Sequence, residues 1–103
     1  MLHIVLITTK DSAEAERIAK QLIEEKLAAC VNVLSKISST YRWKGKIVHA
    51  SEALLLVKTS DKMLDRLIAR VKELHSYENP EILALPIEKG SREYLKWLEE
   101  SLR

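Results

Sequence analysis

The chain has 103 residues, 47% of them hydrophobic, and its 17 basic and 15 acidic side chains leave a net charge of +2 at pH 7. A chain of this length folds as one domain, residues 1–103, around a single core. Because the two signs of charge are nearly balanced and interleaved, no broad electrostatic field favours nucleic acid or a membrane surface as a partner.

The first predicted elements are a strand and a helix. Residues 2–8 form a continuous apolar run rich in β-branched side chains, which is typical of a strand covered by helices. The run is far shorter than the roughly 20 apolar residues of a membrane span and lacks a basic leader, so we expect a cytoplasmic protein. Asp11 and Glu14 form a capping-box pattern, which predicts a helix over residues 11–26.

Two long strand-like stretches follow, residues 29–42 and 47–58, and they predict a β-hairpin. Gly45 lies between them and supplies the backbone freedom that a tight turn requires. Strands of about 12 to 14 residues, at about 3.3 Å each, reach about 40 to 45 Å, more than a compact domain with a radius of gyration of about 13 Å can hold. The hairpin is therefore expected to project from its own domain.

The length of the hairpin has two interpretations. An isolated two-stranded ribbon is barely stable in water, so a long hairpin is expected to pack on a neighbouring subunit of a homo-oligomer. Tyr41 and Trp43, near its tip, would then be buried in that contact. The alternative is a shorter hairpin that bends at residues 38–40.

The second half of the chain predicts a helix over residues 60–75, a strand over residues 82–87 and a last helix beginning at residues 90–91. The complete order is strand, helix, strand, strand, helix, strand, helix. This order predicts an α+β fold of the ferredoxin-like (split βαβ) type, an antiparallel sheet with helices on one face. The other face of the sheet then needs a cover.

The connector of residues 75–82 concentrates polar and ring side chains between two apolar segments. They are His75, Tyr77, Glu78, Pro80 and Glu81. Proline restricts its own backbone and that of its predecessor, so the segment is expected to be a fixed connector, where binding groups often lie. A connector is also commonly polar simply because it meets water. Residues from other segments are needed to distinguish a binding site from a solvent-exposed connector.

Cys30 is the only cysteine, which excludes an internal disulfide and any Cys-x-x-Cys site. A free cysteine in a strand is most often a small buried hydrophobe. The alternative is that the Cys30 thiolate meets the His75 imidazole, since both flank helix ends, and such a pair suits copper or zinc. Neither a small-residue elbow nor a nucleophile-base-orienter set is visible, so we do not expect an enzyme.

Five segments resemble the CutA divalent-ion tolerance family in order and spacing. They are AACVN at 28–32, YRWKGKI at 41–47, LLLVKT at 54–59, HSYENPEI at 75–82 and YLKWL at 94–98. The resemblance implies a homotrimer whose long hairpins embrace adjacent subunits, similar in assembly to PII-type signal transducers. It also implies a non-catalytic role in tolerance of copper and other divalent cations.

The resemblance further implies roles for single residues. Cys30 and His75 match positions discussed as metal ligands, for copper or another divalent cation. Clefts between subunits are implied at Trp43, Lys58, Tyr77, Glu78 and Glu81, and the oligomer interface at Tyr41, Trp43 and Glu52. The alternative function is a PII-like regulatory module whose clefts bind a small anionic metabolite or a partner protein through Lys58, Tyr77 and Glu81.

Three places depart from the family pattern. Ile7 stands where some members have a second cysteine, and Ser76 where a proline usually follows the histidine. Val48 and His49 stand where members often have acidic residues. The first and third departures leave fewer metal donors, and the second removes a ring that would stiffen the connector.

Overall fold

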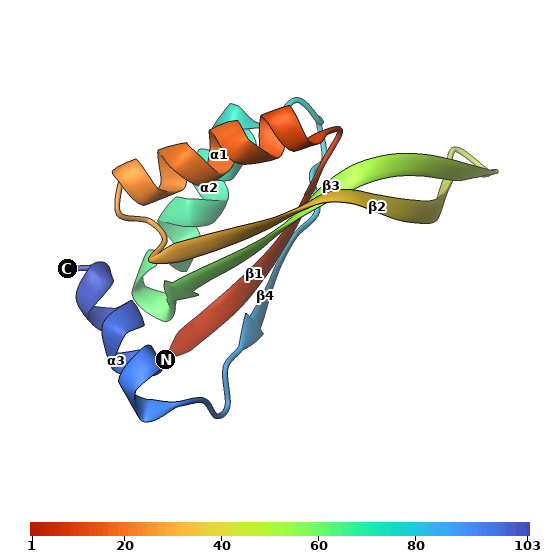
Figure 1. Ribbon diagram of the computed structural model, residues 1–103. Coiled ribbons are helices and arrows are strands. Elements are labelled where there is room, and N and C mark those ends of the chain that lie inside the picture. The colour runs from red at the N-terminus through yellow and green to blue at the C-terminus, as the bar shows by residue number, and fades with distance from the viewer.

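The computed structural model describes residues 1–103, and its elements follow the predicted order (Figure 1). The elements are β1 (Leu2–Thr9), α1 (Ser12–Glu24), β2 (Cys30–Trp43), β3 (Lys46–Ser60), a short 3-10 turn η1 (Asp61–Met63), α2 (Leu64–Leu74), β4 (Ile82–Pro86) and α3 (Arg92–Ser101). The strands form one antiparallel sheet in the order β2-β3-β1-β4. The predicted α+β class with an antiparallel sheet is confirmed.

Helices α1 and α2 cover the same face of the sheet, while α3 packs at the end where β1 begins (Figure 1). The main core lies beneath α1 and α2. Its fully buried members include Val5, Ile7, Ile18, Leu22, Leu55, Val57, Leu67 and Val71. None of the helices is long and apolar enough to cross a membrane.

The opposite face of the sheet is apolar, and α3 covers only the end of it where β1 begins, through Leu98 and Leu102 against Leu2. The prediction that all helices lie on one face is therefore wrong for α3. Because successive side chains of a strand point to opposite faces, Leu55 points into the core while Leu54 and Leu56 point away from it. The same cross-strand register gathers an apolar surface, which we call the open sheet face: Ile4, Leu6, Leu34, Leu54, Leu56, Leu83 and Leu85. Leu83 and Leu85 are 55% and 51% exposed.

Strands β2 and β3 form a hairpin that extends well beyond the rest of the sheet (Figure 1). β1 pairs with β3 only over residues 53–60, whereas β2 pairs with β3 as far as the turn at Trp43 and Lys46. The molecule is 44 Å long although its radius of gyration is 14.1 Å. The predicted long hairpin is confirmed. The alternative prediction, a shorter hairpin that bends at residues 38–40, is wrong, because these residues pair regularly with residues 49–51.

The one irregularity of the hairpin is a bulge at the point where it leaves the sheet. Ser35 and Lys36 of β2 stand opposite the single residue Ala53 of β3, at the last position that also pairs with β1. A bulge increases the local twist and redirects a strand. At the tip, Lys44 and Gly45 have φ values of 49° and 77°, the positive angles of a type I′ hairpin turn.

Two neighbouring residues of α1 test which side of this helix packs against the sheet. Leu22 is fully buried beneath α1, whereas Ile23 is 42% exposed on its outer side. We expect Leu22→Ala to lower the free energy of unfolding by about 3 kcal/mol, because it leaves a cavity in the core. Ile23→Ala should cost less than about 1 kcal/mol. Urea unfolding measures both, and equal losses would contradict the packing of α1.

Candidate functional site

An open cleft of about 980 Å³ lies between the projecting hairpin and the connector from α2 to β4. We call it the hairpin cleft. The hairpin lines it with Ser39, Thr40, Tyr41, Trp43 and Glu52, the connector with Ser76, Tyr77, Glu78, Asn79 and Glu81, and β1 with Thr8. Segments from both halves of the sequence therefore meet at this one place.

The hairpin cleft brings together most of the residues predicted for a ligand site and for an oligomer interface. These residues are Tyr41, Trp43, Glu52, Tyr77, Glu78 and Glu81. Lys58 is the exception, because it lies near the other end of β3, opposite Cys30 on β2. Its ammonium group donates a hydrogen bond to the side-chain oxygen of Asn32. Lys58 is not among the residues that line the hairpin cleft, so it does not share a cleft with Tyr77 within one chain.

The chemistry of the cleft lining is acidic and aromatic. Among its side chains are three carboxylates, from Glu52, Glu78 and Glu81, and no lysine or arginine. Such a lining attracts cations and repels anions. Faces of Tyr or Trp rings add a further attraction for positive charge where they meet it.

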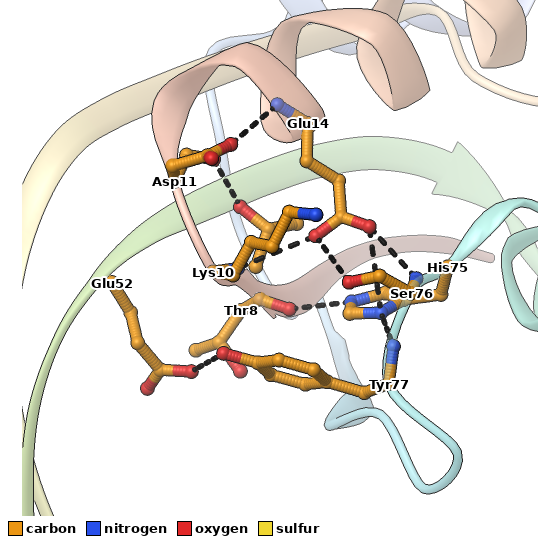
Figure 2. A network of polar contacts seen from close by, with 9 residues as sticks. Thr8, Lys10, Asp11, Glu14, Glu52, His75, Ser76 and Tyr77 are labelled. Carbon is orange, nitrogen blue, oxygen red and sulfur yellow. Dashed lines mark hydrogen bonds and ion pairs between the residues drawn. The ribbon is translucent and has the colours of Figure 1, made fainter.

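Tyr77 joins the connector to the hairpin across this cleft. Its hydroxyl donates a hydrogen bond of 2.7 Å to Oε2 of Glu52 on β3 (Figure 2). Burial raises the pKa of Tyr77 above its usual range, and the hydrogen bond to the Glu52 carboxylate raises it further. The hydroxyl therefore stays a donor across the physiological range of pH.

His75 is held by hydrogen bonds at both ring nitrogens. Nε2 lies 2.7 Å from the carbonyl oxygen of Thr8, and Nδ1 lies 3.0 Å from the backbone nitrogen of Tyr77 (Figure 2). A neutral ring protonated at Nε2 satisfies both contacts, donating to Thr8 and accepting from Tyr77. The side chain is fully buried, so a metal ion would have to displace one of these partners.

The structure does not bring Cys30 and His75 together within one chain. Cys30 stands opposite Lys58, which pairs in turn with Ile4 of β1. His75 contacts Thr8, four residues further along β1, or about 13 Å at about 3.3 Å per residue. Nowhere in the chain do three His, Cys, Asp or Glu side chains gather closely enough to hold a metal ion.

The reason for this separation is the direction of the strands. β2 runs parallel to β1 and begins beside its start, whereas β4 runs antiparallel and begins beside the end of β1. The helix end that precedes Cys30 and the helix end at His75 therefore lie at opposite ends of the sheet. Cys30 is partly buried instead beside Leu98 and Leu102, near α3.

Glu14 belongs to the site, although its sequence pattern predicts only a helix cap. Its side chain is fully buried, and its carboxylate accepts hydrogen bonds from Ser76 N at 2.7 Å, Ser76 Oγ at 3.0 Å and Lys10 N at 3.3 Å (Figure 2). The available signal was its spacing of four residues from Ile18, which places a carboxylate on the apolar stripe of α1.

Two opposing effects act on the pKa of Glu14. Burial raises it, but the hydrogen bonds from Ser76 and Lys10 outweigh burial and hold the pKa below its ordinary value. Ser76 thus fastens the connector with two donors. Its hydroxyl and its backbone N–H, a donor that proline lacks, both hold the connector against α1.

Comparisons with known proteins support the family resemblance carried by the five sequence segments. The family model described as "CutA1 divalent ion tolerance protein" matches residues 3–101. "Divalent-cation tolerance protein CutA" of Thermus thermophilus is 52% identical over 98% of both chains. "Protein CutA 1, chloroplastic" of Oryza sativa subsp. japonica is 44% identical over 97% of this chain and 56% of its own length.

Among solved structures, the periplasmic divalent cation tolerance protein CutA from Archaeoglobus fulgidus superposes with a TM-score of 0.96. Its sequence is 45% identical, and the match covers 100% of both chains. The projecting hairpin and the connector both lie within the superposed region.

The low pKa of Glu14 predicts part of the acid sensitivity of the fold. The unfolded carboxyl has a pKa near 4.5, so on acidification it takes up a proton while the folded carboxyl still resists one. The stabilisation is present above that value and is lost as the pH falls through the folded pKa. Urea unfolding from about pH 6 to about pH 3 should therefore show a shallower decline for Glu14→Gln than for the wild type.

The matched control for this measurement is Glu16→Gln, at an exposed position of the same helix. It removes the same charge without touching the connector, and we expect it to keep the wild-type decline. A wild-type pH dependence in Glu14→Gln would contradict the assignment of a lowered pKa to this carboxyl.

Proposed function

This chain belongs to the CutA1 divalent ion tolerance family, and from that premise we propose that it is a non-catalytic protein that binds divalent cations, copper foremost. One observation supports this ligand class above the others. The hairpin cleft is lined by Glu52, Glu78 and Glu81 and by no basic side chain. Of the common divalent cations, Cu²⁺ binds a given set of nitrogen, oxygen or sulfur donors most tightly.

We propose that a complete cation site takes ligands from more than one copy of the chain. Within a protomer the cleft carboxylates do not converge on a common point. His75 uses both ring nitrogens in the connector, and Cys30 lies at the far end of the sheet. Either residue would therefore become a metal ligand only with rearrangement or with donors from a neighbouring subunit.

The proposed assembly is a homotrimer of ferredoxin-like protomers, in which each hairpin lies across the next copy. The strand order and the packing of α1 and α2 on one face support the protomer type. The open sheet face supports the assembly, because an exposed apolar surface of this kind is typical of an interface. A hairpin that reaches a neighbour makes a head-to-tail contact, and such contacts form closed rings when the rotation closes.

Aromatic side chains of the hairpin support the same arrangement. Tyr41 and Trp43, 43% and 53% exposed in the protomer, would supply the apolar part of the contact.

The alternative of a PII-like module that binds a small anionic metabolite is not favoured. The cleft lining has no lysine or arginine to receive an anion, and Lys58, the predicted cation for that role, lies elsewhere. The relatives include proteins described as chloroplastic and periplasmic, so a cytoplasmic location stays a prediction for this chain.

Calorimetric titration with copper, zinc and magnesium tests the cation site. A variant with Glu52→Gln, Glu78→Gln and Glu81→Gln should bind copper at least about tenfold more weakly than the wild type, a loss of about 1.4 kcal/mol. The control carries Glu88→Gln, Glu93→Gln and Glu99→Gln, exposed positions outside the cleft, and should bind as the wild type does. Weakening by Cys30→Ser, with no effect of the cleft variant, would contradict the proposal.

Sedimentation equilibrium tests the assembly. The wild type should have three times the chain mass of 11.8 kDa. Leu83→Lys places a charge on the open sheet face, at a side chain already half exposed in the protomer, and should dissociate the trimer without unfolding the chain. Ile23→Lys, at an exposed apolar position on α1, is the control and should stay trimeric. A monomeric wild type, or a trimeric Leu83→Lys, would overturn the proposed interface.

A further inference from the structure

We propose that Glu14 is a positioning residue of the hairpin cleft, which clamps the connector through Ser76 and so holds Tyr77 against Glu52. The clamp joins α1, at one end of the protein's sequence, to the segment that supplies half of the cleft. Its effect on cation binding rests on the function proposed above, whereas its effect on the connector does not.

Three successive residues of the connector are each tied to a different element of the domain. His75 bonds to the carbonyl of Thr8 on β1, Ser76 to Glu14 on α1, and Tyr77 to Glu52 on β3 (Figure 2). Attachment at three points fixes both the place and the orientation of a chain segment. The middle attachment is the one that uses two hydrogen bonds to a charged group.

Glu14 and Ser76 depend on each other. A buried carboxylate is stable only when donors satisfy it, and two of the three donors to Glu14 come from Ser76. The third, Lys10 N, is the most distant of the three, at 3.3 Å. Loss of the Ser76 donors would leave the carboxylate poorly solvated, and loss of the carboxylate would release Ser76.

The geometry also explains how a residue outside the cleft acts on it. Glu14 does not line the cleft, but Ser76 does, and Tyr77 follows Ser76 directly in the chain. A displaced Ser76 therefore carries the Tyr77 backbone with it. The Tyr77 N–H then separates from His75 Nδ1, and the Tyr77 hydroxyl separates from Glu52.

A graded series at position 76 tests the clamp. Ser76→Thr keeps both donors, Ser76→Ala keeps only the backbone N–H, and Ser76→Pro keeps neither. Hydrogen exchange of the Tyr77 amide, which is bonded to His75, reports the position of the connector. We expect wild-type exchange in Ser76→Thr and exchange faster by about tenfold or more in Ser76→Pro and in Glu14→Gln, with Ser76→Ala between them.

Two internal references separate this effect from general destabilisation. Glu16→Gln, on the exposed side of α1, should leave the Tyr77 amide unchanged. The amide of Val5, in the centre of the sheet, should keep its protection in every variant that stays folded. Should Ser76→Pro fail to fold, Ser76→Ala and Glu14→Gln still decide the outcome, since each removes part of the same clamp.

Copper titration of the same variants tests the consequence for the cleft. The dissociation constant should rise in the order of the exchange rates, by about tenfold in Ser76→Pro, and Ser76→Ala should add nothing in a Glu14→Gln background. Unchanged Tyr77 exchange in Glu14→Gln would overturn the clamp. Faster exchange with unchanged copper affinity would overturn its role in binding. A wild type that binds no cation refutes the proposed function alone, because the exchange rates still decide the clamp.

Discussion

The two central strands of this protein are apolar on both faces, but α1 and α2 cover only one face and α3 reaches only one end of the other. Leu55 and Val57 of β3 are sealed beneath α1 and α2, while Leu54 and Leu56 of the same strand point to the open sheet face. A strand of this composition is stable when both faces are covered. The uncovered part of this face is the reason for the proposed assembly. In that assembly the hairpin contacts a neighbouring copy, and the cleft lies beside the contact.

The hairpin cleft arises from two local features that lie far apart in the sequence. The bulge opposite Ala53 redirects the hairpin at the point where β1 ends, and the connector is tied down beside that point by His75 and Ser76. The space between them collects carboxylates because Glu52 comes from the hairpin and Glu78 and Glu81 from the connector. An acidic cleft at the edge of one copy of the chain is well placed to take its remaining cation ligands from another copy.

The sequence alone predicted the elements and the length of the hairpin, because these depend on local periodicity. The alternation and length of residues 29–58 were enough to require a projecting ribbon, and Asp11 marked the start of α1. Contacts between distant segments were less accessible. Nothing local indicates that Glu14 receives donors from a residue 62 positions away, and the relation of Cys30 to His75 depended on strand directions that only the assembled sheet defines.

Anomalous diffraction from crystals grown with copper would locate the cation directly and so test the central claim, that the hairpin cleft is the cation site. The account predicts an anomalous peak in the cleft, within about 2 to 2.5 Å of a carboxylate oxygen of Glu52, Glu78 or Glu81 and close to a second copy of the chain. A peak on the Cys30 sulfur at the opposite end of the sheet, with none in the cleft, would contradict it.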